Sequence, residues 1–134
     1  MGAWGTGVFE NDDAADFVGD IIEGNGLSPI ETAIDRVLQV KQGYLEAPEA
    51  SQALAAVAIL VRLKNKDSQV GQATQALDEW IGRTEISPPA GLLVKARNSV
   101  ERVMTEPSEL MELWSEPDEF GNWKASVEGL TAQL

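Results

Sequence analysis

The side chains best suited to chemistry gather near the start of the chain, directly after a glycine-rich stretch. Four aspartates stand there at intervals of one, three and four residues: Asp12, Asp13, Asp16 and Asp20. Carboxylate oxygens are the ligands that Mg²⁺ and Ca²⁺ prefer, so these four define one alternative, a divalent-metal-dependent enzyme of hydrolase type. They lack the ligand order of an EF-hand, and carboxylates on one helix need a second helix to complete a coordination shell. We therefore favour a protein with no metal site and no cofactor.

Other catalytic chemistries are restricted by the amino-acid inventory. The chain contains no histidine and no cysteine. Their absence excludes serine hydrolases of the Ser-His-Asp type, thiol nucleophiles and most zinc enzymes. We assign no catalytic residue and expect a protein that is not an enzyme.

The glycine-rich stretch, residues 2–7, superficially resembles a phosphate-binding loop. No strand precedes it, and no lysine follows it as a Walker-type loop requires. We expect residues 1–10 to form an irregular N-terminal arm in which Trp4, Val8 and Phe9 dock on the rest of the protein.

The charge of the chain is strongly negative and unevenly placed. The 134 residues carry a formal net charge of −12, and residues 1–35 hold eight acidic side chains but no lysine or arginine. Nucleic acids and anionic membranes attract cationic surfaces, so neither is expected as a partner. The longest apolar run, residues 53–61, is about half the length that crosses a bilayer, and no secretory signal is apparent, which together favour a cytoplasmic protein.

Apolar side chains at helical spacing recur along the whole chain, and no alternating run long enough for a strand is present. The pattern predicts one all-α domain over residues 1–134, a compact bundle of about six or seven helices. Ser28 to Glu31 read as a capping box. Helices are expected over residues 12–23, from 28 to about 42, from 48 to about 64, from 67 or 68 to about 82, from about 89 to 106, over 108–114, and from 120 onward.

The distribution of apolar residues also predicts which parts are buried. The helix after Pro48 is apolar nearly all the way round and belongs at the centre of the bundle. Trp80 and Trp123 lie on apolar stripes and are expected in the core. In the first helix the apolar residues, including Phe17, occupy one side, so its carboxylates should point to solvent.

The two ends of the chain also resemble a known family. The matching residues are Met1-Gly2-Ala3-Trp4-Gly5, Phe9 to Ala14, Asp16-Phe17, Glu109-Leu110, Leu113-Trp114 and the stretch from Trp123 to Leu130. They are similar to those of the bacterial domain-of-unknown-function family DUF4259, over the whole chain. The resemblance implies a small bacterial single-domain protein and supplies no catalytic residue.

These observations favour a non-enzymatic module that binds a basic partner protein through its acidic faces. One concrete form is an immunity or inhibitor protein that neutralises a cationic enzyme. The candidate contact residues are Trp4, Glu10, Asn11, Asp12, Asp13, Asp16 and Trp114. Two other readings stay open: the arm locks onto the C-terminal helices through Trp114 and Trp123, or the acidity serves solubility alone.

Overall fold

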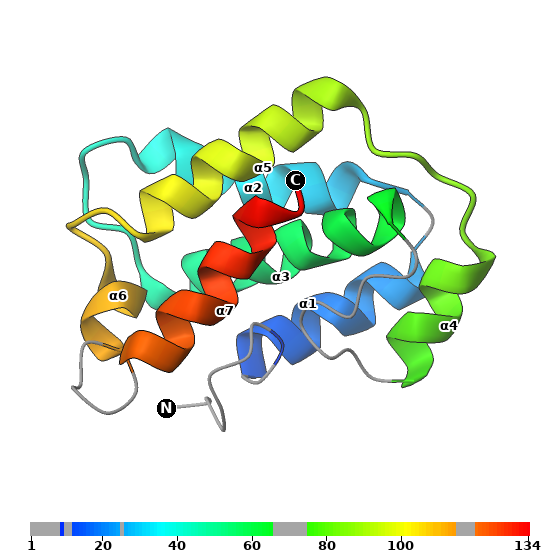
Figure 1. Cartoon of the computed structure of the whole chain (residues 1–134), viewed down its shortest axis with the longest axis horizontal. Coiled ribbons are helices and arrows are strands. Elements are labelled where there is room, and N and C mark those ends of the chain that lie inside the picture. Colours follow the sequence, from blue (N-terminus) through cyan, green and yellow to red (C-terminus); the bar gives the residue numbers. More distant parts are fainter. Residues whose placement is uncertain (1–8, 10–11, 25, 66–74, 115–119) are drawn as a thin grey trace.

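The computed structural model describes residue 9 and residues 12–24, 26–65, 75–114 and 120–134 (Figure 1). Within these residues the chain forms seven helices and no strand, which confirms the predicted all-α class. The helices are α1 (Asp12–Glu23), α2 (Ser28–Val40), α3 (Ala47–Lys64), α4 (Gln75–Arg83), α5 (Ala90–Val103), α6 (Glu109–Leu113) and α7 (Phe120–Ala132). None of the helices in this part of the chain joins enough length to enough apolar character to cross a bilayer.

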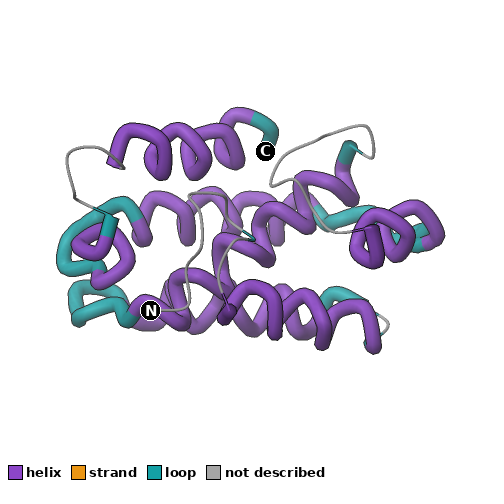
Figure 2. The backbone as a smooth tube through the Cα atoms, turned by 90° about the horizontal axis from the view of Figure 1, so that it is seen from below, coloured by secondary structure: helices purple, strands orange, loops and turns teal. Residues whose placement is uncertain are grey.

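Helix α3 is the centre of the fold, as its uniformly apolar sequence predicts. Every residue from Ala53 to Leu63 is buried, and α3 packs against each of the other six helices. Its run of alanines lets neighbouring helices approach closely, because small side chains leave little bulk between two backbones. Figure 1 shows α3 in the middle of the arrangement, and Figure 2 shows α7 as an outer layer.

The helices around α3 bury one stripe each. In α1 the buried residues are Ala14, Phe17, Val18 and Ile21, and in α2 they are Ile30, Ala33, Ile34 and Val37. Both sets recur at three- and four-residue intervals, which places them on one side of a helix. Phe9, the one described residue of the predicted N-terminal arm, is also buried and belongs to the same apolar cluster.

The two tryptophans expected in the core are there. Trp80 of α4 is 3% exposed, and Trp123 of α7 is 2% exposed. Two apolar residues at helical spacing from buried ones lie further out. Ala76, four residues before Trp80, is exposed, and Leu93, three residues before Ala96, is only partly buried while its neighbour Leu92 is buried. The buried face of each helix is thus rotated slightly from the one that spacing alone predicts.

One charged side chain interrupts the buried part of α3. Arg62 is 5% exposed, and its Nη1 lies 2.7 Å from Oδ1 of Asp78 on α4. A guanidinium removed from water needs a charged or hydrogen-bonding partner, because desolvation without one is costly. The ion pair therefore ties α4 to α3 at the edge of the core.

The start of α2 differs from its sequence-based prediction. Ser28 is the first helical residue instead of the cap, Leu27 occupies the N-cap position, and no side chain caps the helix. The amide of Glu31 donates to the carbonyl of Leu27 at 2.9 Å, so the helix begins one residue earlier than a capping box at Ser28 requires. The predicted capping box is wrong. The helix also ends at Val40, about two residues before the expected point.

The loops before α3 and before α6 are joined at one end of the bundle. Leu45 and Ser108 form an isolated parallel β-bridge. In it the amide of Leu45 donates to the carbonyl oxygen of Pro107, and the amide of Glu109 donates to the carbonyl oxygen of Leu45. Oε1 of Glu109 in turn accepts a 2.7 Å bond from the amide of Ala47. A carboxylate distant in sequence thus satisfies a free amide at the start of α3.

Arg102, near the end of α5, reinforces this junction. Its guanidinium donates to four main-chain oxygens on both sides of the junction: those of Lys41 at 2.6 Å, Gly43 at 2.5 Å, Thr105 at 2.7 Å and Pro107 at 3.0 Å. The planar fork of donors on arginine permits this, whereas a lysine ammonium offers three donors from one atom. The loops after α2 and α5 are therefore held together by one side chain.

Candidate functional site

The acidic residues of α1 lie where the sequence predicts, on its outer side. Asp12, Asp16 and Asp20 are exposed and Asp13 is partly buried. Asp12, Asp16 and Asp20 are spaced four residues apart, so they form a line along the helix. The prediction that the carboxylates of α1 point away from the core is confirmed for these three.

A groove runs beside this line, between α1 and α2, with a volume of about 410 Å³. Helix α1 packs chiefly on α3, and α2 packs on both α3 and α5, so the space between α1 and α2 is left open. Phe17 of α1 and Ala33 of α2, which are almost fully buried, line its base, and Gln52 of α3 also lines it. This volume falls within the range of small ligand-binding pockets.

The walls of the groove carry charge and hydrogen-bonding groups. Asp16 and Asp20 line the α1 side, whereas Ser28, Thr32 and Arg36 line the α2 side. All five are exposed. The groove therefore combines an apolar base with two carboxylates on one wall and two hydroxyls and a guanidinium on the other.

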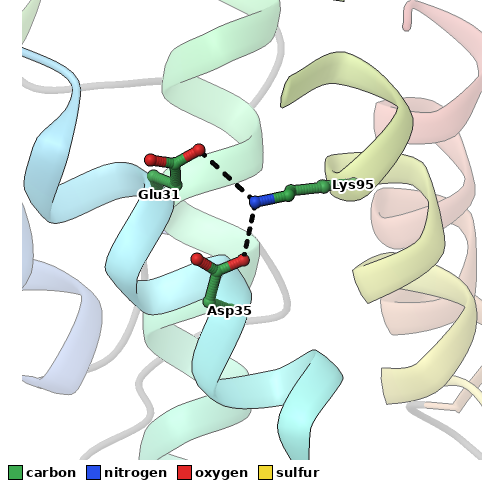
Figure 3. Close-up of polar contacts among 3 residues, drawn as sticks. All are labelled: Glu31, Asp35 and Lys95. Carbon is green, nitrogen blue, oxygen red and sulfur yellow. Dashed lines mark hydrogen bonds and ion pairs between the residues drawn. The ribbon is translucent and has the colours of Figure 1, made fainter. Parts of the chain in front are cut away.

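The outer acids of α2 have a different environment. Nζ of Lys95 on α5 lies 3.4 Å from Oε2 of Glu31 and 3.2 Å from Oδ1 of Asp35, as Figure 3 shows. The hydrogen bond to Asp35 is the main cause that raises the pKa of Lys95 above its ordinary value. Lys95 thus offsets part of the charge of these two acids and ties α2 to α5.

Asp16 and Asp20 differ from these acids of α2. Within the described residues, neither makes an ion pair or a hydrogen bond through its side chain, and neither does Arg36. Charges that remain unpaired at an open groove are available to a ligand, because binding then breaks no internal contact.

The described residues contain no group of three or more acidic side chains placed to hold a metal ion, and Asp12, Asp13, Asp16 and Asp20 are all among them. A hard cation held by protein needs several oxygen ligands around one point. The geometry of α1 therefore lends no support to the alternative of a metal-dependent hydrolase, which stays an untested prediction.

A second groove, of about 530 Å³, lies between α5 and α7. Its lining combines apolar side chains, Val100, Met104, Val127 and Ala132, with the polar side chains of Glu101, Lys124, Glu128 and Thr131. None of the residues that the sequence singled out as contacts lines this groove.

The remaining predicted contact residues divide into two groups. Trp4, Glu10 and Asn11 lie outside the described residues. Trp114 is partly buried and packs against the apolar cluster, away from the residues that line the α1–α2 groove. The structure brings Asp16 to the groove together with Asp20.

Sequence reasoning missed the α2 side of the groove, above all Arg36. The signal that could have drawn attention to Arg36 is its uniqueness, because it is the first basic residue of the chain and follows eight acidic ones. Nothing local to α2 indicates that Arg36 lines the same groove as Asp16, since tertiary packing against α3 brings the two helices to this groove.

The sequence places the chain in a family without an assigned function. The family model for "Domain of unknown function (DUF4259)" matches residues 2–126. No curated protein and no solved structure matches the chain.

Proposed function

The chain belongs to the DUF4259 family, and we propose that it is a non-enzymatic module whose α1–α2 groove binds a basic segment of a partner protein. An immunity or inhibitor protein that blocks a cationic enzyme is one form of this function. The observation that carries the proposal is the pair Asp16 and Asp20, which border the groove without a counterion in the described part of the chain.

The contrast with the neighbouring acids supports this assignment. Glu31 and Asp35 are engaged by Lys95, so a partner that used them would first have to displace an internal cation. Asp16 and Asp20 require no such exchange. A lysine or arginine side chain that enters the groove gains their attraction and covers the apolar base at Phe17.

The charge of the whole chain acts in the same direction. A net charge of −12 attracts a basic protein over distances of about one Debye length, roughly 10 Å at 0.1 M salt. The groove then provides the specific contact after this less specific encounter. Binding should accordingly weaken as salt is added, mainly through slower association.

The test is capture and reconstitution. The full chain is immobilised and exposed to a lysate of its source organism at low salt, bound proteins are identified by mass spectrometry, and each one is purified and its affinity for the chain measured. We expect a basic protein whose affinity falls about tenfold in the double variant Asp16→Asn/Asp20→Asn, which is the effect of losing two partly exposed charge pairs.

A matched control removes the same charge elsewhere. Glu85 and Glu106 are exposed, lie in loops outside both grooves, and make no side-chain hydrogen bond or ion pair with the described residues. The variant Glu85→Gln/Glu106→Gln should bind like the original chain. Equal loss in both double variants would show that only net charge matters and would refute the groove as the binding site, as would a partner whose affinity neither variant changes.

A further inference from the structure

The α1–α2 groove carries a positive charge as well as negative ones, and this restricts what can fill it. Building on the proposed function, we infer that the partner segment carries an acidic side chain close to its basic one, with its carboxylate against Arg36 and its lysine or arginine against Asp16 and Asp20.

Arg36 is available for such a contact. It is exposed, lines the groove, and makes no ion pair or hydrogen bond with any described residue. Side chains three and four residues away on a helix are the ones that could neutralise it locally, and none of them is charged: Thr32, Ala33, Gln39 and Val40.

The acids nearest to Arg36 in sequence do not neutralise it either. Oδ1 of Asp35 is held by Nζ of Lys95, which also contacts Glu31, as the close-up in Figure 3 shows. Arg36 is therefore left as the one cationic side chain among the described residues that line this groove.

A purely basic segment would fit this groove poorly. Its positive charges would gain from Asp16 and Asp20 but would lie near the Arg36 guanidinium, and like charges at short range oppose binding. A carboxylate on the segment replaces this repulsion by attraction to Arg36. It also offers the guanidinium a planar acceptor that arginine binds with two hydrogen bonds. The hydroxyls of Ser28 and Thr32 add hydrogen-bonding groups along the same wall.

The test uses an array of synthetic ten-residue peptides on a glycine, serine and alanine background. Each peptide carries one lysine and one glutamate, and the array as a whole covers every possible spacing between the two. Each peptide has a matched peptide with glutamine in place of glutamate. We expect the best Lys–Glu peptide to bind the full chain about fivefold more tightly than its Lys–Gln match, the size of one partly exposed ion pair.

Non-specific electrostatic attraction opposes a preference for Lys–Glu peptides, so such a preference is strong evidence for a local contact. Because the chain carries a net charge of −12, general electrostatics favour the Lys–Gln peptides. A preference for Lys–Glu peptides therefore reports a local contact. Arg36→Gln should abolish the preference, whereas Arg97→Gln, which removes an exposed arginine of α5 outside the groove, should preserve it.

The outcomes separate this inference from the function on which it rests. If lysine peptides bind and Asp16→Asn/Asp20→Asn weakens them, but Lys–Gln peptides bind as well as Lys–Glu peptides, the role of Arg36 is refuted and the basic-partner function stands. If no lysine peptide binds, or if the aspartate variant binds them unchanged, both are refuted. Circular dichroism of every variant checks that the helices are intact.

Discussion

At the scale of single residues, the most informative side chain is Tyr44, in the loop between α2 and α3. Its hydroxyl donates a 2.6 Å hydrogen bond to Oε2 of Glu112 on α6, although about half of the residue is exposed. That bond is the main cause that raises the pKa of Tyr44 to about 12, and the negative charges of Glu109 and Glu46 act in the same direction. Loss of the phenol proton would place a negative charge on Tyr44 beside the carboxylates of Glu112, Glu109 and Glu46, which opposes its ionisation.

The pKa of Tyr44 can be measured directly, because it is the only tyrosine in the chain. We expect the tyrosinate absorbance of the folded protein to rise with a midpoint near pH 12 instead of 10.0, the ordinary value. Since the folded-state pKa is the higher one, the Tyr44 bond stabilises the fold fully below pH 10 and loses its effect as the pH rises toward 12.

The control for this titration is Glu112→Gln, which removes the charge and keeps a similar shape. Its midpoint should return toward 10.0, because the main cause of the shift is gone. Circular dichroism recorded at the same pH values shows whether the helices persist. An unshifted midpoint in the original chain, with the helices intact, would contradict the Tyr44–Glu112 contact.

At the scale of elements, periodicity and punctuation predicted the helices well. The expected ranges 12–23 and 108–114 differ from α1 and α6 by at most one residue at either end, because strong apolar spacing and prolines define them locally. The start of α2 was predicted to within one residue but its capping box was wrong, because one backbone register competes with the next and tertiary packing decides between them. No local pattern could reveal that Glu109 caps α3 from 62 residues away.

The central position of α3 has a stability consequence. Leu60 is fully buried, so Leu60→Ala should lower the free energy of unfolding by about 2–5 kcal/mol, through lost apolar burial and the cavity that remains. Urea denaturation followed by circular dichroism measures the change. Val94 of α5, which is 58% exposed, is the control: Val94→Ala should alter stability by less than about 0.5 kcal/mol. Similar losses in both variants would be incompatible with α3 as the core.

At the scale of the whole molecule, charge dominates. The net charge of −12 and the acidic line on α1 could both be read from the sequence. The groove could not, because it exists only where α1 and α2 come together on α3, and Arg36 has no neighbour in sequence that reveals its role. The aspartates on the α1 side of the candidate site could thus be predicted, whereas the residues on the α2 side and the geometry of the groove could not.

The excess of negative charge should also make stability depend on salt. Raising sodium chloride from 0.01 to 0.1 M shortens the Debye length from about 30 to about 10 Å and screens repulsion among the acidic side chains. We expect the melting temperature to rise by about 2–4 °C over this range. The rise should be smaller in Asp16→Asn/Asp20→Asn, where two of the repelling charges are absent. A melting temperature that falls with salt would mean that attractive pairs outweigh repulsion.

The junction held by Arg102 has a consequence for how this molecule tolerates change over evolutionary time. All four of its acceptors are main-chain oxygens, so these hydrogen bonds depend on the backbone path of the two loops and not on the side chains of the loop residues. A new side chain at the exposed position Thr105 therefore removes no acceptor of the anchor, and the same holds at Lys41 for residues that tolerate its φ of 54°. The arginine itself has no equivalent among the other amino acids.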